Sequence, residues 1–527
     1  MSLQPILVAG EWRQANSAEN AFSAANPATR EILPEQYPVS NLDEVELALQ
    51  SGHEAVAALR SVAPEKIADF LELFAKKIED NAEALVNIAN IETALPSEPR
   101  LGSIELPRTT NQLRQAAAAA RERSWANAII DTESNIRSKF GPLGGPVVVF
   151  GPNNFPFAFN SAAGGDFAAA IAAGNPVIAK ANTSHPGTTK LLTELAFAAV
   201  QETGLPAGMV QLIYRTPRDV GQTLVSHPLV GATGFTGSRY AGLQLKAAAD
   251  KAGKPIYLEM SSVNPIFILP GALAERSADL ANELYTSCSM GAGQFCTNPG
   301  IAVVPADAAG ETFLTQVKDL FSANQAGVLL GAGGPSDIAE GITVLQENGA
   351  KIVTGGQEAN ITGYAFENTL LRVSGDDFLS NAEALQTEAF GTVNLMVFAK
   401  DTDQMVQIAA QLEGNLTGCL YSHTGGDDDE IYDQVEPVLR EKVGRLLNDK
   451  MPTGVAVVPA MNHGGPFPAT GHPGFTAVGI PTSMPRFAAM HSYDNVRAHR
   501  LPAELQDKNP TGAMWRLIDG TWSQNDI

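Results

Sequence analysis

Cysteine, histidine and long hydrophobic runs are scarce in this 527-residue sequence. Its three cysteines, Cys288, Cys296 and Cys419, cannot form a disulfide framework, and with only eight histidines they show no paired spacing of zinc ligands. We therefore expect no metal site and a reducing compartment. No stretch of about 18 apolar residues occurs, and the first residues, MSLQPILVAGEWRQ, lack a basic segment followed by an apolar run. This pattern predicts a soluble cytoplasmic protein without a membrane partner.

Positive charge is scarce as well. The chain has 35 Lys and Arg residues against 57 Asp and Glu residues, which gives a net charge of −22. A surface this acidic repels the phosphates of nucleic acids and of anionic membranes, so we expect neither as a partner. Any phosphate-binding site must be built locally from a few cationic side chains.

The residues that are present favour a large globular enzyme with two or three domains. Hydrophobic residues make up 44% of the chain and charged residues 17%, with 48 glycines and 33 prolines. Residues 44–93 and 108–123 have helical periodicity. From residue 146 onward, short β-branched runs alternate with helical segments, which predicts a doubly wound α/β sheet. The expected strands are PVVVF (146–150), PVIAK (176–180), VQLIY (210–214), VGATGF (230–235) and PIYLE (255–259).

A second α/β unit is predicted after residue 263, where the same alternation resumes. Its expected strands are NPIFIL, GIAVVP, KIVTGG and VNLMVFA. Residues 129–145 differ, because polar and apolar residues alternate there up to a Gly- and Pro-rich end, which predicts a hairpin arm. The acidic run GGDDDE (425–430) predicts a solvated loop that leads into a helix.

Five motifs occur in order between residues 151 and 393: GPNNFPF (151–157), GFTGSRYAG (234–242), YLEMSSVNP (257–265), GQFCTNPG (293–300) and QTEAFGTV (386–393). Together they resemble the aldehyde dehydrogenase superfamily of pyridine-nucleotide enzymes, over residues 5–470. The resemblance implies a Rossmann-type cofactor domain (1–128 and 146–262), an α/β catalytic domain (263–470), and an oligomerisation arm and tail (129–145 and 471–527). A homodimer or homotetramer is implied too, in which the arm extends a neighbour's sheet.

Cys296 stands between a Gly-Gln pair and a Pro-Gly turn, and taken alone it is either a packed thiol or a reactive one. The resemblance implies that Cys296 is the nucleophile, which forms a thiohemiacetal with an aldehyde and then a thioester. It implies that Asn154 and the Cys296 backbone N–H stabilise the oxyanion, and that Glu259 activates the hydrolytic water. Ser261 and Ser262 replace glycines common in the family, which leaves the pose of the nicotinamide and of Glu259 open.

The resemblance also implies a dinucleotide site that needs no GxGxxG turn. Gly237 and Ser238 are expected to meet the pyrophosphate at a helix N-terminus. Glu388 and Phe390 are expected to hold the nicotinamide ribose and to pack against the ring.

The predicted cofactor is NADP, with NAD as an alternative. Lys180 ends an expected strand and is predicted to reach the adenosine ribose. Thr183 stands where NAD-preferring members commonly have a glutamate, whose charge repels a 2′-phosphate. Arg218 is the preferred partner for that phosphate, and Arg215 is the other candidate.

Within the superfamily, Thr183 and the segment NHGGPFPAT (462–470) resemble the bacterial subgroup that oxidises 2-oxoglutarate semialdehyde (2,5-dioxopentanoate) to 2-oxoglutarate. A fatty or other aliphatic aldehyde is the alternative substrate. Acyl transfer to coenzyme A is opposed by Glu259, and a non-catalytic binding role by the intact set of catalytic residues. No arginine for the substrate carboxylate is identified from sequence. The phenylalanines that can line either a compact pocket or a tunnel are Phe155, Phe157, Phe159, Phe295 and Phe467.

Overall fold

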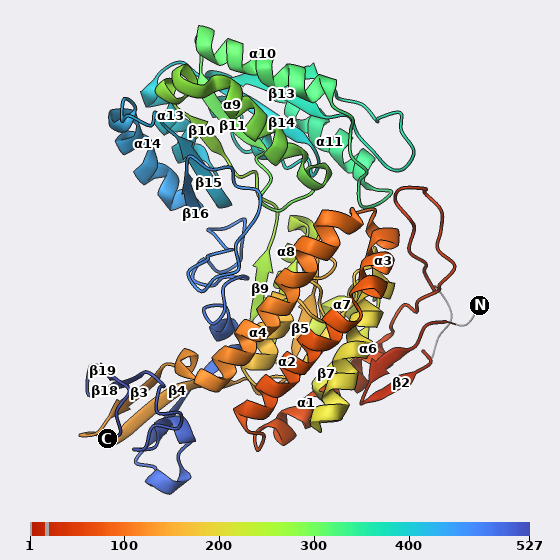
Figure 1. Ribbon diagram of the computed structural model, residues 1–527, viewed down its shortest axis with the longest axis vertical. Coiled ribbons are helices and arrows are strands. Elements are labelled where there is room, and N and C mark those ends of the chain that lie inside the picture. The colour runs from red at the N-terminus through yellow and green to blue at the C-terminus, as the bar shows by residue number, and fades with distance from the viewer. Residues whose placement is uncertain (1–2, 16–20) are drawn as a thin grey trace.

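Three β-sheets organise the residues that the structure describes, 3–15 and 21–527 of a computed structural model. Two sheets have seven strands each and the third has five. Figure 1 shows the two large sheets in separate lobes and the small sheet near the C-terminus, at the lower left. The α/β class predicted from the sequence is confirmed. Residues 1–2 and 16–20 of the predicted cofactor domain lie outside the described residues.

The first sheet contains the five strands predicted between residues 146 and 259, paired in parallel in the order β7-β6-β5-β8-β9. Their Val, Ile and Leu side chains are buried, as is typical of a sheet covered by helices on both faces. Two short strands that the sequence analysis did not predict extend the sheet with antiparallel pairing. The strands are β1 (Ile6–Val8), β2 (Glu11–Arg13), β5 (Val147–Phe150), β6 (Val177–Lys180), β7 (Val210–Ile213), β8 (Ala232–Thr236) and β9 (Ile256–Glu259).

Eight α-helices of the described residues belong to this lobe, and the periodicity at 44–93 and 108–123 corresponds to the first four. Helix α1 begins at a capping box, in which Asn41 accepts a hydrogen bond from the Glu44 N–H and Glu44 accepts one from the Asn41 N–H. Helices α2 and α4 run side by side (Figure 1). The helices are α1 (Leu42–Leu59), α2 (Pro64–Asp80), α3 (Ala82–Thr93), α4 (Leu106–Glu122), α5 (Gly165–Ala172), α6 (Pro186–Thr203), α7 (Arg218–Ser226) and α8 (Arg239–Lys251).

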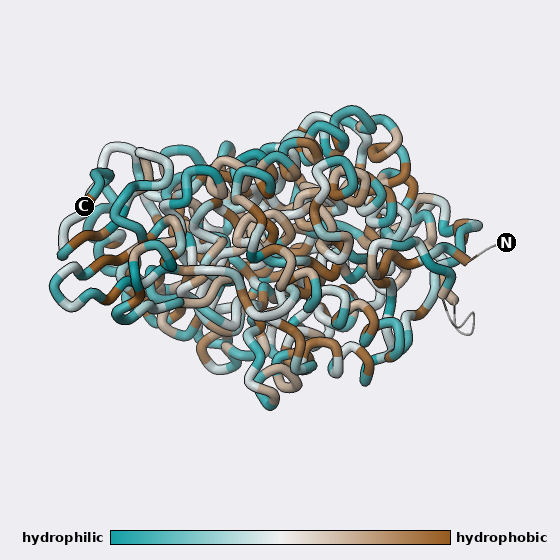
Figure 2. The backbone as a smooth tube through the Cα atoms, turned by 90° about the horizontal axis from the view of Figure 1, so that it is seen from below, coloured by the Kyte–Doolittle hydropathy of each residue, from teal (hydrophilic) through white to brown (hydrophobic). Residues whose placement is uncertain are grey.

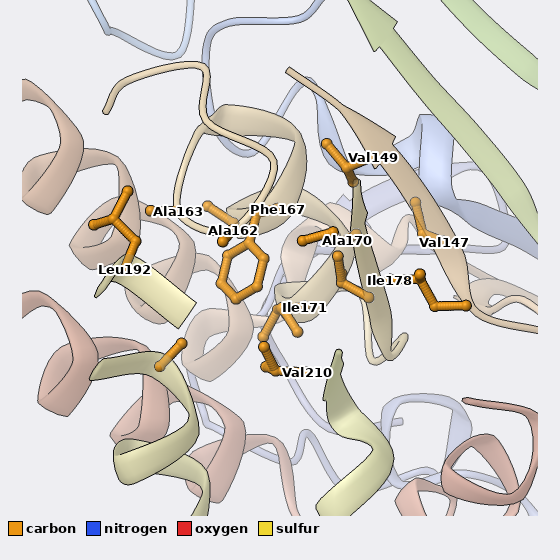
Figure 3. Packing of buried hydrophobic residues seen from close by; sticks show 14 of the residues in the cluster. Val147, Val149, Ala162, Ala163, Phe167, Ala170, Ile171, Ile178, Leu192 and Val210 are labelled. Carbon is orange, nitrogen blue, oxygen red and sulfur yellow. The ribbon is translucent and has the colours of Figure 1, made fainter. Parts of the chain in front are cut away.

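The core of this lobe holds the sheet and helices in fixed positions. Figure 3 shows Phe167 and Ile171 of α5 among strand residues such as Val149 and Ile178. All four side chains are at most 1% exposed. Full burial of a side chain of this size contributes about 1.5–3 kcal/mol relative to exposure. In the backbone view of Figure 2, hydrophilic segments lie mainly at the periphery and hydrophobic segments lie mostly inside.

The second sheet, in the order β12-β13-β14-β11-β10-β15-β16, contains the four strands predicted after residue 263. Three further strands were not predicted: β13 (Thr369–Ser374), β15 (Asn415–Tyr421) and β16 (Val443–Asn448). The acidic run at 425–430 leads into a helix as predicted, but Asp428 is buried and not solvated, because it accepts hydrogen bonds from the N–H groups of Gly271, Ala272 and His423. The remaining elements are β10 (Ile266–Ile268), β11 (Ile301–Pro305), β12 (Lys351–Thr354), β14 (Val393–Ala399), α9 (Pro270–Ser289), α10 (Ala308–Ala323), α11 (Gly334–Glu347), α12 (Gly375–Ser380), α13 (Thr402–Gln411) and α14 (Asp429–Lys442).

The third sheet joins the predicted hairpin to the C-terminal segment. Strands β3 (Ala128–Asp131) and β4 (Ile136–Pro142) form the antiparallel hairpin. Strand β17 (Ala488–Asp494) pairs with β4, and β18 (Arg516–Ile518) pairs with β3 and with β19 (Thr521–Ser523). Among the described residues, no helix has the length and apolar character needed to cross a membrane.

Candidate active site

A cleft of about 620 Å³ lies at the carboxyl ends of the first sheet's strands, where ligands of open α/β sheets bind. Its walls include the ends of β5, β6, β8 and β9. Most of the site residues predicted from the motifs line this cleft. They are Asn154, Lys180, Thr183, Gly237, Ser238, Glu259, Cys296, Glu388 and Phe390.

Cys296 lies in a loop that the surrounding chain holds closely. Asn264 donates a hydrogen bond from Nδ2 to the Cys296 carbonyl oxygen (2.9 Å). Gly293 has a φ of 74°, and a Cβ there would lie 2.1 Å from the backbone of Gly391, so a larger residue would displace the loop. Burial, and next the negative charge of Glu259, raise the pKa of the Cys296 thiol well above its usual value. The thiol is therefore protonated in the free protein and needs a proton acceptor before it can react.

Glu259 ends β9 and is 4% exposed. Its Oε1 lies 2.9 Å from Nε2 of His463, but this contact lacks hydrogen-bond geometry. Neither carboxylate oxygen has a hydrogen-bond partner within residues 3–15 and 21–527. Because a buried carboxylate without donors is costly, a water or a ligand is the expected partner.

His463 is the site residue that the sequence analysis did not assign. Its Nε2 lies 3.4 Å from Sγ of Cys296, in addition to its contact with Glu259. The segment that follows His463 runs beside the end of β9, where the Met260 N–H donates to the Ala469 carbonyl (2.8 Å). The His463 N–H donates to Oγ1 of Thr476 (2.7 Å), which fixes the backbone on the other side. The chain thus places an imidazole between a thiol and a carboxylate.

The ligand atoms of Glu259, Cys296 and His463 all lie within 4.8 Å of one another. Sulfur, nitrogen and oxygen ligands at such spacing are also a set that binds zinc. The absence of a metal, expected from the sequence, stays a prediction.

Asn154 is buried and faces the same loop. Its Nδ2 donates to the carbonyl oxygen of Gln294 (3.0 Å), which uses one of two amide hydrogens. Arg100 fixes the Asn154 backbone, because its Nη2 donates to the Asn154 carbonyl oxygen (2.9 Å) and its Nη1 pairs with Glu105. Glu105 in turn accepts hydrogen bonds from the N–H groups of residues 157 and 158. Asn154 is thus held by a buried network, with one donor left for a ligand.

The predicted pyrophosphate site lies at the start of α8. Ser238 is the N-cap residue of this helix, and its Oγ accepts a hydrogen bond from the Ala241 N–H (3.3 Å). A Cβ at Gly237 would lie 2.8 Å from the ring of Phe235, so a side chain there would crowd the turn. Free N–H groups at a helix N-terminus attract anions, which suits a pyrophosphate.

Two arginines, Arg215 and Arg218, were considered beside Lys180 for the 2′-phosphate. Burial, together with the charge of Arg215, lowers the pKa of Lys180 to about 8. Arg218 begins α7 and is exposed, with its guanidinium 5.6 Å from the ring centre of Tyr240. The charge of Arg215 thus acts on Lys180, and the choice of Arg218 for the 2′-phosphate stays a prediction.

On the opposite wall, Glu388 and Phe390 line the cleft. Burial raises the pKa of Glu388, and hydrogen bonds from Ser261 and Ser262 oppose the rise. The left-handed residue of the 259–265 segment is Asn264 (φ 47°), so neither serine needs glycine's conformational freedom. The hydroxyl of Ser262 instead accepts from the Leu416 N–H (3.0 Å) and ties the segment to β15.

The five phenylalanines considered for the substrate pocket separate in the structure. Phe155 and Phe159 line the cleft, and Phe295 packs edge-on against Phe155 with ring centres 5.2 Å apart. Phe157 is 1% exposed and belongs to the core of the first lobe, whereas Phe467 is 59% exposed. Three of the five are thus close to Cys296 and the cleft.

Together, the helix N-terminus, the half-buried Lys180 and the apolar wall fit a nicotinamide dinucleotide. Residues 12–438 match the family model described as "Aldehyde dehydrogenase family". The chain therefore belongs to the aldehyde dehydrogenase family.

Curated relatives resemble the chain over nearly its full length. It is 39% identical to alpha-ketoglutaric semialdehyde dehydrogenase 2 of Azospirillum brasilense in an alignment of 531 residues, and this alignment covers 99% of each chain. It is 35% identical over 499 residues to alpha-ketoglutaric semialdehyde dehydrogenase of Acinetobacter baylyi, covering 92% of this chain and 93% of that one. Aldehyde dehydrogenase C of Pseudomonas syringae, solved with NAD+ and octanal, has the same fold (TM-score 0.79, 20% identity, 93% of this chain and 96% of that one).

Proposed function

We propose that this enzyme oxidises 2-oxoglutarate semialdehyde to 2-oxoglutarate and prefers NADP as the acceptor. The observation that carries the chemistry is the contact of His463 with both Cys296 and Glu259 at the cleft. The substrate is supported by two relatives named for it, at 39% and 35% identity over almost the whole chain.

In the proposed mechanism, the His463–Glu259 pair accepts the thiol proton of Cys296. The thiolate attacks the aldehyde carbon and forms a C–S bond, and the carbonyl oxygen becomes an oxyanion. The amide of Asn154 and the backbone N–H of Cys296 donate to that oxyanion. As the oxyanion re-forms the C=O bond of a thioester, a hydride leaves the same carbon, for which a bound nicotinamide cofactor would supply the acceptor.

Glu259 then acts on the thioester that remains on Cys296. Its carboxylate takes a proton from a water molecule, which attacks the acyl carbon and breaks the C–S bond. The acid leaves, and the thiol regains its proton. A carboxylate without hydrogen-bond partners in the described part of the chain is well suited to hold this water.

Cofactor preference rests on the groups around the adenosine ribose. A glutamate at the position of Thr183 would repel a 2′-phosphate, whereas the Thr183 hydroxyl can donate to it. Lys180 would supply positive charge, together with Arg218, the arginine preferred from the sequence, or with Arg215, whose charge acts on Lys180. Gly237 and Ser238 would hold the pyrophosphate, and Glu388 and Phe390 the nicotinamide riboside.

We further propose the domain roles expected from the sequence: cofactor binding by 1–128 and 146–262, catalysis by 263–470, and assembly by 129–145 and 471–527. The five-stranded sheet carries exposed side chains such as Met490 and Trp522, which an assembly would cover. A homodimer or homotetramer in the cytoplasm is the corresponding proposal.

An aliphatic aldehyde is the second candidate substrate, because Phe155, Phe159 and Phe295 form an apolar cluster at the cleft. Initial rates with 2,5-dioxopentanoate, succinate semialdehyde and a C10–C14 aldehyde, each with NADP and with NAD, separate the candidates. We expect the highest kcat/KM for 2,5-dioxopentanoate with NADP. A higher value for the long aldehyde would refute the substrate assignment and leave the chemistry of Cys296 in place.

A further inference from the structure

Arg108, in the first turn of α4, lies behind the aromatic wall of the cleft. Its guanidinium carbon is 5.4 Å from the ring centre of Phe155 and 5.2 Å from that of Phe159. Both rings line the cleft that also contains Cys296 and Glu259. The charge of Glu105 acts most strongly on Arg108, and those of the Cys296 thiolate, once formed, and of Glu259 act on it as well, so the guanidinium is near the reacting atoms.

Apart from these two rings, the guanidinium of Arg108 has no hydrogen-bond or ion-pair partner among the described residues. Its Nε and Nη2 are buried without a hydrogen bond, and in residues 3–15 and 21–527 no carboxylate lies within ion-pair distance. The other two arginines of α4 do have partners, because Arg114 pairs with Glu79, and Arg121 pairs with Asp69 and Glu72. Arg108 thus differs from the other two arginines of α4 in having no ion-pair partner among the described residues.

Neighbouring arginines near the cleft also have partners. Arg100 pairs with Glu105 and donates to the Asn154 carbonyl. Arg445 donates to the carbonyl oxygens of Pro452 (2.7 Å) and Gly454 (3.2 Å). The guanidinium groups of Arg100 and Arg445 thus donate to backbone carbonyl oxygens, whereas that of Arg108 donates to none among the described residues.

Burying an unpaired guanidinium is costly, and burial lowers the pKa of Arg108. The chain has 57 acidic residues, yet none of those described forms an ion pair with this guanidinium. The planar guanidinium fits a carboxylate through two parallel hydrogen bonds, which a neutral aldehyde cannot offer. The geometry therefore suits an anionic group at the end of the substrate away from Cys296.

We propose that Arg108 binds the carboxylate of the substrate and selects oxo acids over neutral aldehydes. This assignment rests on the proposed function and names the residue that recognises the acid. With the carboxylate on Arg108, the aldehyde end is directed along Phe155 and Phe159 toward Cys296.

The test compares 2,5-dioxopentanoate with pentanal, a neutral aldehyde of the same chain length, in the intact enzyme. For Arg108→Gln we expect kcat/KM for 2,5-dioxopentanoate to fall roughly 100-fold, because charge-assisted hydrogen bonds are lost. The value for pentanal should stay near that of the unmodified enzyme. Inhibition by 2-oxoglutarate should weaken in parallel. Arg108→Lys keeps the charge without the paired geometry and should give an intermediate loss. Arg114→Gln, on the same helix, is the matched control.

Two outcomes separate the two proposals. If the unmodified enzyme prefers pentanal, the proposed function is wrong before any variant is compared. If the unmodified enzyme prefers the oxo acid but Arg108→Gln lowers kcat/KM for both substrates equally, or for neither, Arg108 does not bind the carboxylate. Thermal melting and NADPH binding check folding, and if Arg108→Gln is unfolded, the substrate ratio of Arg108→Lys decides. An unchanged ratio in a folded Arg108→Lys would then overturn the assignment.

Discussion

Replacing His463 with glutamine removes the imidazole that lies against both Cys296 and Glu259. Its Nε2 is 3.4 Å from Sγ and 2.9 Å from Oε1. Because burial and the charge of Glu259 raise the pKa of the thiol, the reaction depends on a group that takes its proton. A positioned acid–base group contributes about 100- to 10,000-fold. The contact to sulfur is long, so we expect the lower part of this range, a loss of about 100- to 1,000-fold in kcat/KM, or about 3 to 4 kcal/mol.

Two assays measure this loss at pH 7.5. The first is kcat/KM for 2,5-dioxopentanoate with saturating NADP. The second is the rate at which iodoacetamide alkylates Cys296, followed by peptide mass, which reports thiolate formation without substrate or cofactor. Both should fall in His463→Gln, and both should be unchanged in His53→Gln, whose side chain is exposed on α1. If the two rates of His463→Gln equal those of the control, the proposed role of His463 in activating the thiol is wrong.

Three further predictions concern the base and the cofactor site. Glu259→Gln should release a burst of NADPH and then turn over slowly, because water is no longer activated, and an unchanged steady-state rate in stopped-flow absorbance would remove Glu259 as the base. Thr183→Glu should raise the KM for NADP far more than the KM for NAD, since the new charge repels the 2′-phosphate, and equal effects on both cofactors would contradict the argument. The pKa of Lys180 is about 8, so its positive charge is present below that pH and lost above it. Titrations monitored by fluorescence should therefore show NADP affinity falling between about pH 7 and about pH 9, with less change for NAD, and parallel pH dependence would count against a contact between Lys180 and the phosphate.

The fold was predictable where periodicity was strong. Parallel strands covered by helices are continuous apolar runs, so segments such as 147–150 and 393–399 were identified from sequence. Strands β13, β15 and β16 were missed because polar residues and glycine interrupt their apolar pattern. In β15, for example, the side chain of Asn415 binds the chain at residues 262–264 instead of marking a loop.

The candidate site was predictable as far as its residues lie in short motifs. His463 and Arg108 were not found, because neither is near a catalytic residue in sequence: His463 is 167 positions from Cys296, and Arg108 lies in an ordinary amphipathic helix. Only the folded chain shows that the segment after His463 pairs with the end of β9, and that Arg108, unlike Arg114 and Arg121 of the same helix, has no ion-pair partner among the described residues. The unusual segment at 462–470 was the available signal for His463. For Arg108 the sequence offers none.

The most direct test of the account is the mass of the covalent intermediate. Glu259→Gln is mixed with NADP and 2,5-dioxopentanoate, quenched in acid during the burst, digested and mapped by mass spectrometry. We predict a 2-oxoglutaryl thioester on the peptide that contains Cys296, in an amount equal to the NADPH formed. NADPH formation with no acyl group on Cys296, or with the label on Cys288 or Cys419, would contradict the proposed mechanism.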